Sequence, residues 1–449
     1  MDRLRLFLQV RYLLGMLLFA SVSVQADAID LIEIYHLAQS NDPTFEAARY
    51  ALEAAQQKIP QARAGLLPLV SANGNDNSTR AASQFTGIPI VNRDVHAWTW
   101  TLQLTQPLIR VQNVFAYSQS LSQVDEATAQ YARVEQDMIL RVTQAYFDVL
   151  VAEESIAVSD AQLRAAEQQL ELATRGFSAG ANAVTDMHEA KARVGLARSQ
   201  RVAASNELEI KRSELEKIVG QLPGALVALQ PAVVVPKPQP DDPHAWIDQA
   251  REKNPAVLAP KAALAAAEDE VWKNRAGHLP TLDLVASYGK NFSSGSLTTP
   301  ADFATRSNSS MAGLQLTVPF FAGGSVNSHV SEAIANKFKA ADELEVARRQ
   351  AGTDARQAYS AIMNGLAQID ALESAVESSQ SAVKGNQVGY RLGIHMNIDV
   401  LNAEQQLYTA RRDLVKARYD TLFQGLKLKA AAGVLTESDL ASINSMLVR

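Results

Sequence analysis

The sequence contains one pattern twice, in the same order. Residues 61–68 (Gln-Ala-Arg-Ala-Gly-Leu-Leu-Pro) return at 273–280 (Lys-Asn-Arg-Ala-Gly-His-Leu-Pro), and residues 102–107 return at 314–319 with the same separation. A repeat of this length indicates two copies of one structural unit. We therefore expect a first structural repeat over 27–222, a Pro-rich linker over 223–243 and a second structural repeat over 244–449.

The composition excludes several classes of protein. The 449 residues are 47% hydrophobic, enough for a large core, and include no cysteine. The absence of cysteine rules out a disulfide scaffold, a thiolate metal site and a lipid anchor on an N-terminal cysteine. The net charge of -6 and the lack of a Lys/Arg-rich stripe argue against nucleic acid as a partner.

The amino terminus has the pattern of an export signal. Arginines flank and interrupt a short apolar run at 13–20, and Val24-Gln25-Ala26 fits a small-x-small cleavage site, so we expect a signal peptide over 1–26. The alternative is a retained anchor, but Arg11 keeps the apolar stretch below the roughly 18–20 residues of a spanning helix. No later run approaches that length, so a mature chain that crosses a membrane would do so as a β-barrel.

Each repeat contains a predicted β-hairpin. Large apolar residues such as Trp98, Trp100, Leu102 and Leu104 alternate with Thr and Gln, which gives one face suited to lipid and one suited to water. An ordinary half-buried antiparallel sheet would show the same alternation and stays open here. The predicted hairpins are 67–107 and 279–319, in which strands 67–75 and 279–292 precede Ser/Thr/Asn/Gly-rich loops at 76–95 and 293–308.

The remaining segments predict very long helices. Neither Gly nor Pro occurs from 108 to 175. From Met138 to Phe177 a series of residues, all apolar except Ser159, keeps an unbroken 4,3 spacing, which is typical of coiled-coil packing. A helix of this length spans roughly 95 Å and cannot fold inside a compact globule. A second seam after the glycine turn predicts an antiparallel helical hairpin. The later seams, 355–376 and 400–417, predict a second such hairpin.

Prolines mark the predicted joints between strands and helices. Pro68, Pro107, Pro280 and Pro319 stand where each strand is expected to meet a helix, because proline ends a helix and redirects the chain. Four strands are too few to close a barrel, for which about eight is the minimum, and an open edge cannot lie in hydrocarbon. Several chains must therefore share one barrel, and the spacing does not say how many.

Several of these segments resemble the TolC family of outer-membrane export channels of Gram-negative bacteria. The resemblance extends from Ile34 to Leu435 and is most specific at 277–284 and 319–328. It implies a homotrimer with a shared 12-stranded β-barrel, four strands per chain, continuous with an antiparallel α-helical coiled-coil tunnel through the periplasm. It also implies a periplasmic adaptor protein and an inner-membrane ABC or RND-type pump as partners, besides outer-membrane lipid.

The resemblance implies a periplasmic gate at the helical tips. The matching positions are Thr185 and Asp186 on the first hairpin, with Tyr390, His395, Asp399 and Asn402 on the second. His395 stands where arginine is usual in the best-known member of the family, and Asn402 where that member has a second aspartate. These differences would weaken the closing bond and halve the density of the charge ring. The adaptor-docking turns implied by the family are Gly180, Ala181, Gly393 and Ile394.

Two roles are open for the tip aspartates and for His395. Copies of Asp399 around one axis would form a cation-attracting ring, whereas an aspartate in the first helical turn also complements the helix dipole. His395 could act as a pH-sensitive latch, or it could be an exposed loop histidine. Glycine at the turns suits the positive φ that a helix end requires.

The motifs give little support to catalysis. The seven histidines are scattered, and the sequence contains no metal-binding, nucleophile-elbow, phosphate-binding or cofactor motif. Two hypotheses remain: a trimeric outer-membrane export duct, and a periplasmic coiled-coil scaffold or receptor without conduction. The alternating strands with tryptophans favour the duct. The missing lipid-anchor cysteine slightly favours type I protein secretion over multidrug efflux, although the chain does not reveal its cargo.

Overall fold

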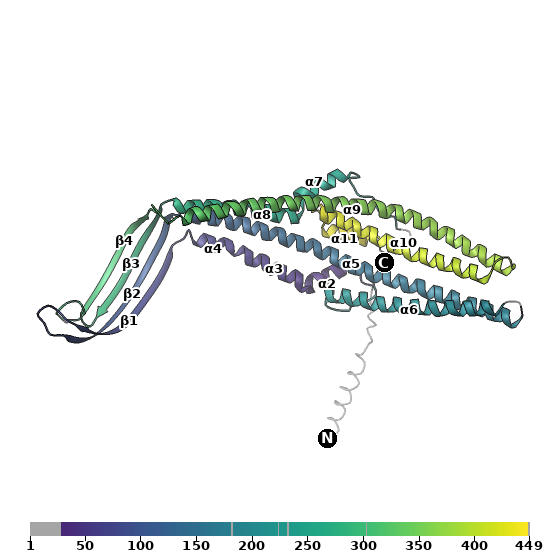
Figure 1. Cartoon of the computed structure of the whole chain (residues 1–449), viewed down its shortest axis with the longest axis horizontal. Coiled ribbons are helices and arrows are strands. Elements are labelled where there is room, and N and C mark those ends of the chain that lie inside the picture. Colours follow the sequence, from purple (N-terminus) through teal and green to yellow (C-terminus); the bar gives the residue numbers. More distant parts are fainter. Residues whose placement is uncertain (1–27, 181–182, 223, 231–232, 302, 448–449) are drawn as a thin grey trace, which may run out of the picture.

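The protein is a long rod of helices with a β-sheet at one end (Figure 1). This computed structural model describes residues 28–180, 183–222, 224–230, 233–301 and 303–447; the predicted signal peptide lies outside them. The sheet bends away from the axis of the helices. At the opposite end of the rod lie the turns of two helical hairpins. None of the described helices has an apolar stretch long enough to cross a membrane.

Four antiparallel strands form the sheet in the order β1-β2-β3-β4. They are β1 (Leu69–Ser83), β2 (Val91–Ile109), β3 (Thr281–Ser293) and β4 (Thr305–Thr317). The two hairpins predicted from the repeats thus join through β2 and β3, with Trp100 opposite Lys290 and Leu104 opposite Ala286. The alternation in polarity is clearest at 98–105 of β2 and 314–317 of β4, and it is the pattern of a sheet with two different faces.

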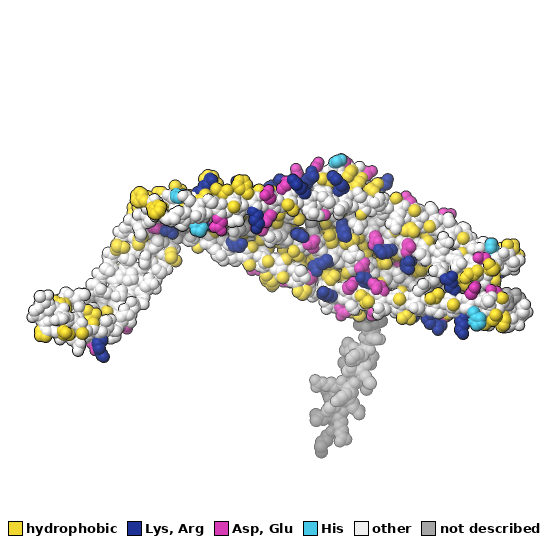
Figure 2. Space-filling model, in the orientation of Figure 1, with side chains coloured by type: hydrophobic (Ala, Val, Ile, Leu, Met, Phe, Trp, Pro, Cys, Tyr) yellow, Lys and Arg dark blue, Asp and Glu magenta, His cyan; other side chains and the backbone are white. Residues whose placement is uncertain are grey.

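The strand register sorts the side chains onto two faces, because directly opposed residues lie on one side of the sheet. We call them the apolar face and the polar face. In the view of Figure 2 the middle of the sheet is neither charged nor hydrophobic, as expected for the polar face. The apolar face includes Trp98, Trp100, Leu102, Leu104, Leu284, Tyr288, Phe292 and Leu314, and the polar face includes Asn73, Asn75, Thr99, Thr101, Gln103, Ser287, Asn291 and Gln315.

The predicted loops were too long. Residues 76–83 and 91–95 continue the β1–β2 ladder, and only 84–90 connect the two strands. Likewise β4 begins at Thr305, so the predicted loop 293–308 shortens to 294–304. The prediction failed because these strand ends carry mostly polar, exposed side chains on both faces, and so show no alternation that would mark a strand. Backbone pairing then continues after the alternation in polarity has ended.

Two pairs of long helices form the rod. The helices are α5 (Val111–Ser178), α6 (Val184–Val219), α9 (Ser325–Arg391) and α10 (Asn397–Ala431). The 68 residues of α5 span about 100 Å at 1.5 Å each. Most residues of the predicted seams are buried, although Phe177, at the end of the first seam, is 43% exposed. Helix α5 buries Met138, Val142, Ala145, Val149, Ala152, Ala166 and Ala173, and α10 buries Val400, Ala403, Leu407, Ala410 and Ala417.

Shorter helices complete each repeat and lie along the rod between its middle and the sheet (Figure 1). In the first repeat these are α2 (Leu31–Asn41), α3 (Pro43–Gln56) and α4 (Lys58–Ala64). In the second they are α7 (Pro243–Lys253) and α8 (Pro255–Arg275), followed by the short helix η1 (Ala276–His278), and α11 (Glu437–Asn444) ends the described chain. The largest hydrophobic core lies at this level, where Tyr146 and Phe147 are fully buried.

Two tyrosines of this core hold the segment that links the repeats. The Tyr146 hydroxyl donates to the Val227 carbonyl at 2.7 Å, and the Tyr419 hydroxyl accepts from the Leu229 N–H at 3.3 Å. Burial raises the pKa of Tyr419 to about 12, so its hydroxyl stays neutral at physiological pH. Because Tyr146 lies on α5 and Tyr419 on α10, the linker is hydrogen-bonded to a long helix of each repeat.

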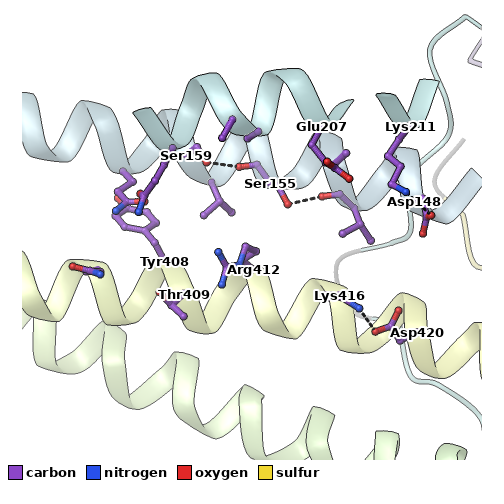
Figure 3. Close-up of a pocket in the computed structure, with 18 residues that line it drawn as sticks. Asp148, Ser155, Ser159, Glu207, Lys211, Tyr408, Thr409, Arg412, Lys416 and Asp420 are labelled. Atoms are coloured by element: carbon purple, nitrogen blue, oxygen red, sulfur yellow. Dashed lines mark hydrogen bonds and ion pairs between the residues drawn. The ribbon is translucent and has the colours of Figure 1, made fainter. Parts of the chain in front are cut away.

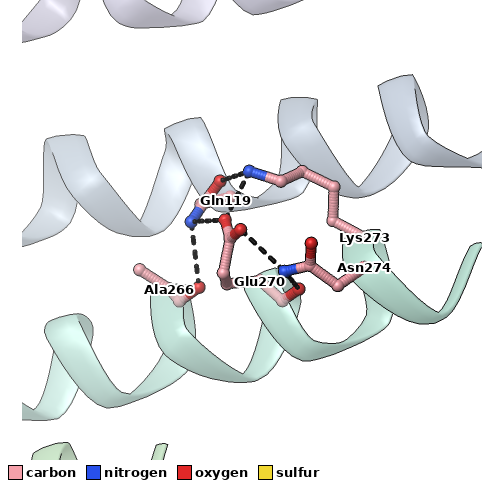
Figure 4. Close-up of polar contacts among 5 residues, drawn as sticks. All are labelled: Gln119, Ala266, Glu270, Lys273 and Asn274. Carbon is pink, nitrogen blue, oxygen red and sulfur yellow. Dashed lines mark hydrogen bonds and ion pairs between the residues drawn. The ribbon is translucent and has the colours of Figure 1, made fainter. Parts of the chain in front are cut away.

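A polar cluster joins the repeats nearer the sheet (Figure 4). Glu270 of α8 accepts from the Gln119 amide of α5 at 2.9 Å and from the Asn274 amide at 2.8 Å, and it pairs with Lys273. Burial works to raise the pKa of Glu270, but these three donors outweigh it and hold the pKa below its usual range. The cluster is therefore most favourable with Glu270 ionised, and its contribution is lost as the pH falls through that lowered pKa.

The four prolines lie between the sheet and the helices, with one difference from the prediction. Pro68 and Pro280 directly precede β1 and β3, and Pro319 lies between β4 and α9. Pro107 instead lies inside β2, next to a shift in the β2–β3 register between Pro107 and Ile109. A proline has no N–H to donate, so a strand accepts it where the ladder is already irregular.

Candidate functional site at the helical tips

Each helical hairpin turns on a glycine in the left-handed conformation. Gly180 follows the end of α5 and has a φ of 74°. Gly393 follows the end of α9, in the turn of the second hairpin, and has a φ of 73°. Glycine adopts this conformation without the steric cost that other residues meet. Ile394 is 73% exposed at the second turn. Of the predicted docking residues, Ala181 lies outside the described residues.

The predicted gate residues of the first hairpin begin α6. Thr185 and Asp186 lie in the first turn of this helix, where Thr185 is exposed and Asp186 is partly buried. An aspartate here complements the positive end of the helix dipole. The position of Asp186 therefore fits the simpler of its two predicted roles without excluding the other.

The predicted gate residues of the second hairpin cluster around its turn. The Met396 N–H donates to the Asp399 carboxylate at 2.9 Å, so Asp399 caps the start of α10. His395 Nδ1 lies 3.8 Å from the same carboxylate, and both side chains are close to half exposed. Tyr390 is partly buried in the last turn of α9. Asp399 thus has a capping role that needs no other copy of the chain.

The His395 ring packs directly on the backbone of Gly389. A Cβ at position 389 would lie 2.1 Å from the His395 Cδ2 atom, a separation that no real contact allows. Sequence reasoning did not single out Gly389, although Gly389-Tyr390 before the second turn corresponds to Gly176-Phe177 before the first. The absence of a side chain at 389 is what allows His395 to fold back against α9.

We expect Gly389→Ala to destabilise this tip by about 1–3 kcal/mol, the usual cost of overpacking. Hydrogen exchange of the amides at 392–396 should become faster in the variant. Gly385→Ala is a matched control on the same helix, because nothing lies within 4 Å of its added Cβ, and alanine is the better helix former. Adding His395→Ala to Gly389→Ala should restore slow exchange; exchange that stays fast would show that the clash is not the cause.

Asn402 connects the two hairpins within one chain. Its side-chain oxygen accepts from Arg193 of α6 at 2.7 Å, and the same guanidinium also donates to Gln405. A further contact joins the hairpins where the Tyr408 hydroxyl of α10 donates to the Ala161 carbonyl of α5 at 3.4 Å. Sequence reasoning treated Asn402 as a missing charge and overlooked Arg193, because no local pattern relates two residues so distant in the chain.

A groove of about 600 Å³ extends from these links toward the middle of the rod and separates α5 and α6 from α10. Figure 3 shows that polar side chains from all three helices line it, with Lys211 next to Asp148 and Lys416 paired with Asp420. Their nitrogen–oxygen distances are 3.3 and 2.5 Å. Apolar side chains such as Val151 and Val158 line the same groove, so its surface is mixed. The polar part lets the hairpins separate at a lower cost in exposed apolar area than a wholly apolar surface would.

A partly buried carboxyl group makes the second hairpin sensitive to pH near its tip. Glu404 of α10 accepts from the Gln387 amide of α9 at 3.2 Å. Burial raises the pKa of Glu404 above its usual range, and the Gln387 hydrogen bond offsets only part of that shift. The packing of α10 on α9 therefore favours protonated Glu404 and weakens as the pH rises through the raised pKa.

The polar face of the sheet is almost free of charged side chains. Among the described strand residues it carries only two charged side chains, at opposite ends. Arg93 donates to the carbonyls of Thr299 and Pro300 at 2.6 Å, and Asp283 pairs with Arg110 at 2.6 Å. Between them lie hydroxyl and amide groups from all four strands. In the described part of the chain no cluster of three or more His, Asp or Glu residues could hold a metal ion.

Comparison with known proteins identifies the family to which the chain is related. The model of the outer membrane efflux protein family matches residues 34–221 and 246–434. The alkaline protease secretion protein AprF of Pseudomonas aeruginosa is 34% identical over 94% of this chain and 88% of its own length. The outer membrane protein TolC of Escherichia coli is 31% identical over 96% of this chain and 86% of its own length.

A solved structure shows the same architecture. The outer membrane protein VceC of Vibrio cholerae matches with a TM-score of 0.76 at 18% identity, over 90% of this chain and 96% of its own. The four-stranded sheet and long helical hairpins described above are thus a TolC-like fold, as the sequence predicted. The family is one of outer-membrane channels rather than enzymes. By sequence and by fold, this chain belongs to the outer membrane efflux protein family.

Proposed function

We propose that three copies of this chain form an outer-membrane duct that exports its cargo without chemical change. One observation carries the proposal: the sheet has one apolar and one polar face, and in the described residues β1 and β4 each pair along one edge only. The free edges of three copies would pair to close a barrel of twelve strands, because hydrocarbon does not tolerate unpaired backbone groups. The polar faces would then line the pore.

The helical rods would continue this pore through the periplasm and close at the tips. In this proposal the gate consists of Thr185, Asp186, Tyr390, His395, Asp399 and Asn402. The exposed turns at Gly180, Gly393 and Ile394 would receive the periplasmic adaptor, which connects the duct to an inner-membrane pump. The link from Arg193 to Asn402 would hold the second hairpin against the first while the entrance is closed.

Type I protein secretion is the cargo route that the relatives favour. The Pseudomonas relative is named for secretion of an alkaline protease. The uncharged polar face described above also suits an unfolded polypeptide, because its hydroxyl and amide groups can exchange hydrogen bonds with any peptide backbone, and no fixed charge along the strands selects one sign. Multidrug efflux remains the alternative, and co-purification of the adaptor and pump from the native host would separate the two.

The test of this function is conductance in a planar lipid bilayer. We expect the purified protein to show small, mostly closed openings, because the tips close the entrance. Asp399→Asn should leave the cap at Met396 in place, since asparagine also accepts a hydrogen bond. If copies of Asp399 form a ring, this variant should lower the cation-to-anion permeability ratio toward one; Asp342→Asn, exposed on α9, should not.

Two outcomes would contradict the proposal at different levels. Correctly folded trimers that never conduct would reject the duct and favour the periplasmic scaffold. Conductance with an unchanged permeability ratio in Asp399→Asn would keep the duct but leave Asp399 only its capping role.

A further inference from the structure

Besides Arg80, which pairs with Asp94, two further basic residues lie on the apolar face of the sheet. Lys290 of β3 is opposite Trp100 on β2 and Asn308 on β4. Arg306 of β4 is opposite Phe292, and its guanidinium carbon lies 5.3 Å from the centre of that ring. The two residues are therefore diagonal neighbours on adjacent strands and on the same side of the sheet.

Aromatic rings surround Lys290 on this face. Trp98 and Phe292 stack with centroids 6.1 Å apart, and Trp100 and Tyr288 meet edge to face at 5.7 Å. By register, Lys290 lies between these two pairs. A lysine in such a setting keeps its alkyl stem against the rings and extends its ammonium group toward the polar side of a membrane interface.

No acidic side chain of the sheet neutralises this pair. Among the described strand residues only Asp76 and Asp94 are acidic on the apolar face. Asp76 lies 2.8 Å from His96, and Asp94 pairs with Arg80 at 2.7 Å. Neither Lys290 nor Arg306 forms an ion pair with a described residue. The apolar face thus has an excess of cations, and the excess is located at these two positions.

In the proposed duct, the position of Lys290 along β3 would place it at the outer edge of the membrane. From Leu282 to Lys290 the apolar face presents only Leu, Ala and Tyr at alternate positions of β3. These eight steps of about 3.3 Å, tilted by about 40°, rise by about 20 Å. The apolar band of an outer-membrane barrel is about 25 Å tall. The Lys290 side chain can extend its ammonium group beyond the backbone toward the outer surface of the membrane. The ammonium group would therefore reach the level of the lipid headgroups.

We propose that Lys290 and Arg306 bind the phosphate of an anionic lipid headgroup in the outer leaflet. The proposal depends on the proposed function, in which the apolar face meets lipid. A phosphate offers several acceptor oxygens to the ammonium and guanidinium groups together, and basic residues at a membrane surface attract anionic lipids. The four rings position the cations and would pack against the glycan or acyl part of the lipid.

The experiment compares lipid binding by the purified full-length chain in detergent with that of Lys290→Gln/Arg306→Gln. The probes are diphosphorylated lipid A, phosphatidylcholine and inorganic phosphate, and the readouts are the bound lipid in native mass spectrometry and the shift in melting temperature. We expect lipid A to bind at least tenfold more tightly than phosphatidylcholine, and the double variant to lose that preference. Inorganic phosphate should have little effect, because it lacks the part that packs on the rings.

A matched control variant also loses two positive charges, but in the helical hairpins, far from the sheet. Lys191→Gln/Lys384→Gln removes two exposed lysines from α6 and α9, neither of which forms an ion pair with a described residue. It should bind lipid A as the unmodified protein does. An equal preference for lipid A in both double variants would overturn the proposal, as would a loss of trimer stability without a change in lipid preference.

Conductance separates this inference from the proposed function. If Lys290→Gln/Arg306→Gln still conducts but binds lipid A like the unmodified protein, the lipid site is wrong and the duct stands. If no form of the protein inserts and conducts, the proposed function itself is wrong. Circular dichroism of the double variant should match the unmodified protein, because glutamine at the rim of the sheet removes charge without leaving a cavity.

Discussion

Arg141→Met is expected to destabilise the folded chain by about 3–5 kcal/mol, the cost of leaving a buried charge without its partner. The Arg141 guanidinium of α5 lies 2.5 Å from the Asp42 carboxylate, whose side chain is only 4% exposed. Asp42 also accepts from the Thr44 N–H at 2.8 Å and so caps α3. The loss should appear as a lower melting temperature in detergent, by several degrees.

An exposed pair on the same helix provides the control. Arg133 lies 3.7 Å from Asp137, with both side chains more than half exposed, so Arg133→Met should change the stability by less than about 1 kcal/mol. Combining Arg141→Met with Asp42→Asn should recover most of the loss, because asparagine keeps the cap without the charge. A melting temperature that Asp42→Asn fails to raise would show that packing, not charge, explains the effect.

The same pair gives a prediction for acid. Burial works to raise the pKa of Asp42, but the Thr44 N–H and the Arg141 guanidinium outweigh it and hold the pKa below its usual range. The stabilisation is therefore complete above the unfolded pKa of about 3.9 and is lost as the pH falls through the lower folded value. Asp42→Asn should remove this part of the acid sensitivity.

Arg193→Ala is expected to open the proposed duct. The variant removes the donor to Asn402 and Gln405, which joins α6 to α10 near the tip. If each exposed link contributes about 1 kcal/mol, three copies lose about 3 kcal/mol, which raises the open fraction about a hundredfold where the closed state dominates. The measurement is the open probability in planar bilayers.

Arg198→Ala is the matched control for this variant. Arg198 lies on the same helix but faces Glu167 of α5, within the first hairpin, at 3.6 Å. Its removal should leave the open probability unchanged. If Arg193→Ala behaves like this control, the link between the hairpins does not hold the entrance closed, and the gate must rest on the contacts around Tyr390, His395 and Asp399.

The architecture was predictable where it follows from periodicity. The 4,3 spacing in 138–177 identified a seam, and the structure buries Met138, Val142 and Val149 on it. The alternation around Trp100 identified the two faces of the sheet. The ends of the strands were not predictable, because residues such as Ser78 and Thr79 pair through their backbones although polar, exposed side chains lie on both faces.

The sequence by itself determined the two-fold repetition, the long helical hairpins, the two-faced strands and the family, because each depends on a pattern that recurs along the chain. Only the tertiary structure decided which side chains meet: Arg193 with Asn402, His395 on Gly389, Arg141 with Asp42, and Lys290 diagonal to Arg306. These contacts join elements whose relative position depends on the packing of the whole rod and sheet. No spacing between residues encodes that position directly.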